Sequence, residues 1–192
     1  MTIYGWLIFT LWGLLVVYWV LTVGVVRRST GVRWTWWREI AVRLGFFALV
    51  VQALRVAVVD SRLPGASLYA LGTSMPAGLI GVLVCASGVG LAILGRACLS
   101  RNWRTPLSHQ EVPVLVTSGP YAWVRHPIYS GMLLAMLGSA LGQSVLWLLP
   151  LVVYGPHFIL CARREENSLI GQFPQDSRAY MKRTKMLLPF VV

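Results

Sequence analysis

Hydrophobic residues along this chain gather in long runs, separated by short basic or proline-containing segments. Residues 3–26, 40–60 and 76–95 form three runs of about 20 residues, and a fourth extends for 35 residues from Ile128 to Ala162. About 20 apolar residues in a helix that rises 1.5 Å per residue cross a ~30 Å hydrocarbon core. The pattern therefore predicts an all-α, polytopic integral membrane protein.

The fourth run is too long for a single membrane span. A break at Gly142-Gln143-Ser144 would divide it into a helical hairpin. The first leg, Ile128 to Leu141, is then only ~21 Å long, which places the loop before it below the membrane surface. We therefore predict about five transmembrane helices, the last two forming a helical hairpin. Residues 165–173, and a segment that starts at Pro174, are predicted as short cytoplasmic C-terminal helices.

Composition agrees with this architecture and indicates one domain. The chain is 57% hydrophobic and 12% charged, whereas soluble domains carry about a quarter charged residues. We interpret residues 1–192 as a single membrane domain, in which residues 1–95 supply three N-terminal transmembrane helices. The segment Met1–Val26 has no basic start and a long apolar run, so we do not expect it to be a cleaved signal.

The net charge of +11 would suggest a nucleic-acid partner in a soluble protein, but its distribution indicates membrane orientation instead. With five passes, residues 27–43, 96–125 and 163–185 share one side and hold five, four and six of the 17 Lys and Arg. Positive residues concentrate on cytoplasmic loops. We predict an external N-terminus, a cytoplasmic C-terminus and no nucleic-acid partner. The short loops and the absence of a disulfide pattern favour a bacterial inner membrane.

The cysteines and histidines do not have metal-site spacing. Cys85, Cys98 and Cys161 form no CxxC or Cys/His pattern, and three histidines are scattered along the chain. We predict no metal. His157, which follows Pro156 in the last apolar run, is interpreted as a hydrogen-bonded interior residue.

Most polar side chains that could take part in binding or catalysis lie on the predicted cytoplasmic side. They are Asn102, His109, Glu111, Tyr121, Arg125, His126, Tyr129, Arg163, Arg164, Glu165, Glu166 and Tyr180. A cytoplasmic pocket beside lipid could take a soluble cofactor from the cytosol and a lipidic substrate from the bilayer. In the second run, Gln52 and Arg55 share one helical face. Arg55 either faces a cavity or has a structural role, pairing with Asp60 or reaching the membrane surface.

Two stretches together carry a family resemblance. Tyr121-Ala122-Trp123-Val124-Arg125-His126-Pro127-Ile128-Tyr129, followed by Glu165-Glu166-x-x-Leu169-x-x-x-Phe173, resembles the isoprenylcysteine carboxyl methyltransferase family and its relatives, the bacterial phospholipid and lipid methyltransferases. The resemblance covers roughly residues 102–189. It implies S-adenosylmethionine as methyl donor, with S-adenosylhomocysteine as product. It also implies that residues 96–192 form the cofactor-binding and catalytic part.

The resemblance also implies individual site residues. The expected cofactor contacts are Val114, Leu115, Val116, Tyr121, His126, Pro127, Tyr129 and Glu165. A carboxylate such as Glu165 can accept hydrogen bonds from ribose hydroxyls or pair with an ammonium group. In the family an Arg commonly lies one helical turn before the glutamate pair, where this chain has Cys161. Candidate substrate-binding or catalytic residues are therefore Arg163, Arg164, Arg55 and Glu166, the last as a general base or a holder of water.

We expect a lipidic or prenylated small substrate that offers a carboxylate or another oxygen, sulfur or nitrogen nucleophile. Two alternatives stay open. One is a membrane lipid reductase of the sterol type that uses NADPH, because such enzymes look similar in their C-terminal region. The other is a non-catalytic lipid-binding protein, which would tolerate His126→Ala and Glu165→Ala. A monomer is compatible with the sequence, which does not determine the oligomeric state.

Overall fold

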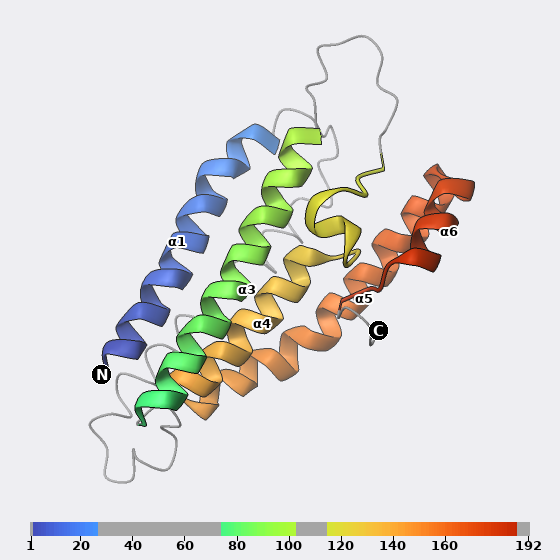
Figure 1. Cartoon of the computed structure of the whole chain (residues 1–192). Coiled ribbons are helices and arrows are strands. Elements are labelled where there is room, and N and C mark those ends of the chain that lie inside the picture. Colours follow the sequence, from blue (N-terminus) through green and yellow to red (C-terminus); the bar gives the residue numbers. More distant parts are fainter. Residues whose placement is uncertain (1, 27–73, 103–114, 188–192) are drawn as a thin grey trace.

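The computed structural model describes residues 2–26, 74–102 and 115–187, and these residues are helical wherever they are regular. The α-helices are α1 (Ile3–Val26), α3 (Met75–Asn102), α4 (Pro127–Gly142), α5 (Leu148–Gln172) and α6 (Pro174–Arg183). Two short 3₁₀ helices, η3 (Gly119–Ala122) and η4 (Val145–Trp147), precede α4 and α5 (Figure 1). The predicted all-α class is confirmed for this part of the chain.

Three of these helices are long and apolar enough to cross a membrane. The spans are Ile3–Thr22, Met75–Leu99 and Val145–Gln172, and Pro127–Gly142 is a shorter apolar helix. The chain is therefore a helical integral membrane protein. The predicted second span, residues 40–60, lies outside the described residues, and Arg55 lies there with it.

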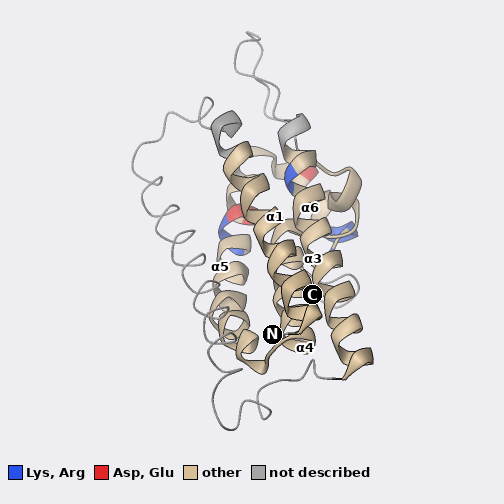
Figure 2. Cartoon of the chain, turned by 90° about the vertical axis from the view of Figure 1, so that its left-hand side faces the viewer, with Lys and Arg blue, Asp and Glu red and all other residues tan. Residues whose placement is uncertain are grey.

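The predicted helical hairpin is confirmed. Helix α4 ends at Gly142, and Ser144 adopts extended backbone and accepts a hydrogen bond from the Leu146 amide before α5 begins. In Figure 1, α4 and α5 run side by side from this turn. Figure 2 shows that the charged residues of the described segments, coloured blue and red on the ribbon, lie toward the other end of the bundle.

One expectation about the C-terminal region is wrong. Residues 165–172 are not a separate short helix, because α5 continues through them to Gln172. A change from apolar to charged side chains does not interrupt the backbone hydrogen bonds of a helix. Pro174 does end it, as predicted, by taking the first position of α6. Helix α5 therefore joins the apolar bundle to the charged end without a break.

Helices α3 and α4 pack with their backbones in close contact. A β-carbon placed on Gly88 would lie 2.4 Å from the Ala135 nitrogen, and one on Gly138 would lie 2.3 Å from the Cys85 nitrogen. Small residues permit such an approach between membrane helices. The short helix α4 is therefore held firmly against α3, and this contact fixes the position of the Pro127 end of α4.

Helix α1 packs against α3 and α4. Trp12 is buried and stacks on Trp147, with ring centroids 5.3 Å apart. Its indole nitrogen donates a hydrogen bond of 3.0 Å to the Ser139 hydroxyl. This contact gives the indole N–H a partner inside an apolar core.

We predict that Gly88→Ala lowers the melting temperature of the detergent-solubilised protein, whereas Gly90→Ala does not. An added methyl group at Gly88 collides with the α4 backbone, and overpacking of this kind costs about 1–3 kcal/mol. Gly90 lies in the same helix and has nothing within 4 Å of its β-carbon position, so alanine there improves helix propensity without a clash. Equal melting temperatures for the two variants would contradict the close α3–α4 contact.

Candidate functional site

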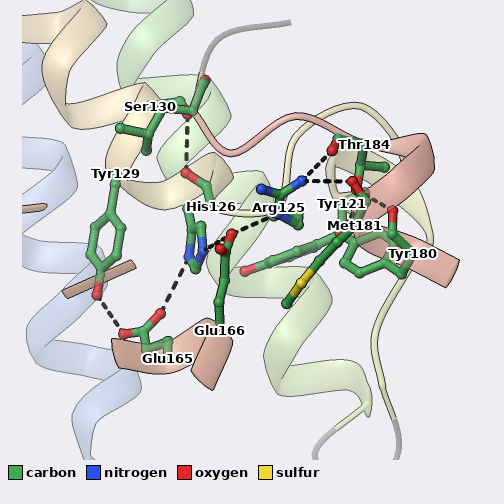
Figure 3. A network of polar contacts seen from close by, with 11 residues as sticks. Tyr121, Arg125, His126, Tyr129, Ser130, Glu165, Glu166, Tyr180, Met181 and Thr184 are labelled. Carbon is green, nitrogen blue, oxygen red and sulfur yellow. Dashed lines mark hydrogen bonds and ion pairs between the residues drawn. The ribbon is translucent and has the colours of Figure 1, made fainter. Parts of the chain in front are cut away.

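The candidate site begins with a backbone pairing between segments far apart in sequence. Val124, in the loop before α4, forms an isolated parallel bridge with Lys185, just after α6. The amide of Arg125 donates to the Lys185 carbonyl at 2.8 Å, and the amide of His126 donates to the Met186 carbonyl at 3.1 Å. This pairing presents the Arg125 and His126 side chains toward α5 (Figure 3).

Arg125 connects three parts of the structure. Its Nε donates to Oε1 of Glu166 on α5 at 2.6 Å, and its Nη1 donates to the carbonyl oxygens of Met181 and Thr184 (Figure 3). The side chains of Arg125 and Glu166 are 13% and 12% exposed. Because water screens this charge pair poorly, it holds the loop, α5 and the end of α6 together.

His126 lies between the two neighbouring glutamates. Its Nε2 is 3.3 Å from Oε1 of Glu166, and its Nδ1 is 3.3 Å from Oε2 of Glu165. The imidazole is 7% exposed. Both ring nitrogens therefore face carboxylates, an arrangement that fixes the plane of the ring.

The two glutamates have different surroundings. Glu166 is directed into the network, whereas the side chain of Glu165 is 53% exposed. Oε1 of Glu165 accepts a hydrogen bond of 2.6 Å from the Tyr129 hydroxyl. Consecutive helical residues point ~100° apart. Glu166 therefore joins the loop before α4 to α5, whereas Glu165 is oriented by Tyr129 and stays open to a ligand.

Aromatic rings form a wall beside Glu165. The rings of His126 and Tyr129 stack with centroids 5.6 Å apart, and Tyr129 stacks on Phe158 of α5 at 5.0 Å. The planes are within 15° of parallel. The site thus combines an anionic carboxylate with aromatic faces, a combination suited to a positively charged group.

Two buried tyrosines, Tyr121 in η3 and Tyr180 in α6, connect the loop before α4 to the C-terminal helix. The Tyr180 hydroxyl donates to the Tyr121 carbonyl at 2.6 Å, and the Thr184 hydroxyl donates to the Tyr180 carbonyl at 2.8 Å. Burial raises the pKa of Tyr180 to about 12, and burial also raises the pKa of Tyr121 above its ordinary value. Both hydroxyls are therefore protonated at neutral pH.

The structure brings together many of the residues singled out from sequence. Tyr121, His126, Tyr129, Glu165 and Glu166 belong to one network, and Pro127 begins α4 directly beside it. Leu115 and Val116 lie in the segment that leads into η3, whereas Val114 and Arg55 lie outside the described residues.

Arg163 and Arg164 are exposed on α5, outside this network. Sequence reasoning did not assign roles to Arg125, Ser130 or Thr184. Ser130 donates to the His126 and Leu187 carbonyls and so ties α4 to the C-terminal segment. The signal for Arg125 was its position inside the motif, next to His126.

Comparison with known proteins agrees with this picture. A family model described as phospholipid methyltransferase matches residues 77–176, which is more than half of the chain. The chain belongs to the phospholipid methyltransferase family. The match runs from α3 to the start of α6, so it includes the helix against which α4 packs and the residues from Tyr121 to Glu166, and it ends before Tyr180 and Thr184.

Two individual proteins are similar over part of their length. The cobalt-zinc-cadmium resistance protein CzcN of Cupriavidus metallidurans is 33% identical over 107 residues, covering 53% of this chain and 46% of that protein. The solved structure of the eukaryotic intramembrane Ras methyltransferase ICMT (isoprenylcysteine carboxyl methyltransferase) is 22% identical. It aligns with a TM-score of 0.60, covering 77% of this chain and 53% of that one. This likeness shows a shared fold, and the chain spans about half the length of each protein.

Replacing Arg125 by Ala should loosen the C-terminal segment. The substitution leaves Glu166 without its guanidinium partner and removes the donor to the Met181 and Thr184 carbonyls. Breaking a buried ion pair of this kind costs about 3–5 kcal/mol. We expect a lower melting temperature and faster tryptic cleavage after Lys182 and Lys185. Arg178→Ala, at an exposed position on α6, is the matched control and should change stability by less than about 0.5 kcal/mol. Equal cleavage in both variants would exclude this role.

Tyr180→Phe should change the response to alkaline pH. The pKa of Tyr180 is about 12 in the folded protein and about 10 in an unfolded chain. Its contribution to stability is therefore present below about pH 10 and is lost as the pH rises toward 12. We expect the variant to be about 1 kcal/mol less stable than wild type at neutral pH. We also expect it to lose less stability than wild type between pH 10 and pH 12. Thermal unfolding at pH 7, pH 10 and pH 12 measures both effects, and parallel losses in the two proteins between pH 10 and pH 12 would refute this assignment.

Proposed function

We propose that this chain is an integral membrane methyltransferase that uses S-adenosylmethionine as methyl donor. The observation that carries the proposal is the half-exposed carboxylate of Glu165, oriented by Tyr129 and His126 beside parallel aromatic rings. The family match supports methyl transfer as the chemistry. When bound, this cofactor supplies a methyl group on a positively charged sulfur atom.

The residues present fit such a cofactor. A carboxylate has about four acceptor sites, and Tyr129 and His126 occupy one on each oxygen of Glu165. The remaining sites can accept two ribose hydroxyls or pair with an ammonium group. The stacked faces of Tyr129 and Phe158 favour a nearby cation. Leu115, Val116, Tyr121 and Pro127 complete the proposed cofactor contacts, together with Val114.

The proposed roles of the remaining candidates follow from their places on α5. Glu166 faces Arg125 and His126, so we propose that it positions the network. A role of Glu166 as general base or as a holder of water would compete with its ion pair to Arg125. Arg164 falls three residues after Cys161, the position at which the family commonly has an Arg, and therefore within about 60° of that face. Arg163 points to another side of the helix. We assign Arg164 to acceptor contact ahead of Arg163, with Arg55 proposed for the same role.

The methyl acceptor is proposed to be a lipidic or prenylated small molecule that enters from the bilayer. Helix α5 presents exposed apolar side chains such as Val152, Ile159 and Leu160 along its apolar part, and the same helix carries Glu165 and Glu166 at its charged end. Residues 163–185 carry six Lys and Arg, which supports a cytoplasmic position for this end and an external N-terminus. A bacterial inner membrane is proposed as the location.

Isothermal titration of the detergent-purified protein with S-adenosylhomocysteine tests the cofactor. We expect binding in the micromolar range, lost in His126→Ala and in Glu165→Gln. The glutamine variant keeps the shape of the side chain but removes the charge. Gln172→Ala, an exposed position near the end of α5, is the matched control and should bind as wild type does.

The same preparation should show no heat of binding with NADPH. Absence of S-adenosylhomocysteine binding in folded protein, or binding of NADPH in its place, would exclude the proposed cofactor. Folding is verified by the melting temperature of each variant, which separates a lost contact from a lost fold.

A further inference from the structure

A pair of polar side chains lies on α5 below the network, in the apolar part of the helix. The Sγ atom of Cys161 is 3.5 Å from Nε2 of His157, one helical turn away. His157 also meets the edge of Tyr154 and lies near Phe158, with ring centroids 6.1 Å away in each case. An ionisable side chain inside a membrane helix is costly and usually has a function.

Packing among the helices that the structure describes does not account for this pair. The buried residues of α5 are Pro150, Tyr154, Phe158 and Ala162, spaced four apart. His157 and Cys161 each precede one of these residues and so point ~100° away from that face. Both are half-buried. They flank the contact between α5 and the other described helices, and each keeps part of its surface exposed.

The pair is continuous with the proposed cofactor site. Cys161 lies one turn, or ~6 Å along the axis, before Glu165 on the same edge of α5. The Phe158 ring beside His157 stacks on Tyr129, whose hydroxyl bonds to Glu165. A polar strip therefore descends from the open carboxylate toward the middle of the membrane helix.

The other candidates for a proton acceptor among the described residues of the network are already engaged. Glu166 receives Arg125 and His126, and both ring nitrogens of His126 face carboxylates. Of the two histidines in the part of the chain that the structure describes, His157 is the one whose Nε2 meets a thiol rather than a charged group. Neutral imidazole is the most common general base in proteins.

We propose that His157 and Cys161 form the acceptor end of the site and that His157 takes the acceptor's proton. This inference rests on the proposed methyltransferase function. A lone pair on the acceptor's nucleophilic atom forms the bond to the donor methyl carbon. The carbon–sulfur bond of the sulfonium breaks and leaves its electrons on sulfur, and the nucleophile's proton passes to Nε2 of His157. The acceptor is therefore an amphiphile whose nucleophile carries a proton, and not a carboxylate.

Transfer of a tritiated methyl group from S-adenosylmethionine to dodecanethiol, dodecylamine and dodecanoate tests the proposal. We expect wild type to methylate the thiol or the amine. His157→Ala and His157→Asn should lower this rate about 100-fold or more, the usual contribution of a general base, and added imidazole should restore part of it in His157→Ala. His157→Asn keeps a polar partner for Cys161 and controls for misfolding.

Calorimetry separates this inference from the function on which it rests. Both variants should bind S-adenosylhomocysteine as wild type does, because His157 lies outside the cofactor contacts. Unchanged transfer in both variants, no rescue by imidazole, or wild-type transfer to dodecanoate alone would overturn the role of His157. Wild-type protein that binds the cofactor product but methylates neither thiol nor amine would overturn the acceptor class. Failure of wild type to bind S-adenosylhomocysteine would instead reject the proposed cofactor.

Discussion

The carboxylate of Glu166 can stay out of water at this end of the bundle because Arg125 and His126 both reach it. The same guanidinium donates to the Met181 and Thr184 carbonyls, so one ion pair joins the loop, α5 and the C-terminal segment. Removing one charge would leave its partner buried and uncompensated. The orientation of His126, and through it the open carboxylate of Glu165, depends on this contact.

This network needs a rigid platform, which the helix bundle supplies. The glycine contacts between α3 and α4 leave little freedom for α4 to slide, and the Trp12 and Trp147 stack fixes α1 on the other side. Continuous α5 then carries both the charged end of the site and the His157–Cys161 pair. A shift of α4 along α5 would move Tyr129 away from Glu165 and Phe158 together, so helix packing and ligand binding are expected to be coupled.

Several features that depend on local sequence pattern were predicted correctly. The hairpin turn followed from Gly142 and the length of the apolar run, and the stop before Pro174 followed from proline geometry. The grouping of His126, Tyr129 and Glu165 followed from a family motif. Three features required the folded structure. The pairing of Val124 with Lys185 joins residues about 60 positions apart, and no periodicity encodes it. The different surroundings of Glu165 and Glu166 depend on the rotation of α5 about its axis. The continuity of α5 past Ala162 was hidden by a change in polarity that leaves the backbone unaffected.

Photo-crosslinking with tritiated S-adenosylmethionine, followed by peptide mapping, tests most directly whether this network is the cofactor site. The account predicts label in the peptides that contain His126 to Tyr129 and Glu165, reduced by excess S-adenosylhomocysteine and lost in Glu165→Gln. Competed label confined to α1 or α3 would show that the cofactor binds elsewhere, and the assignment of the Glu165 site would then be wrong.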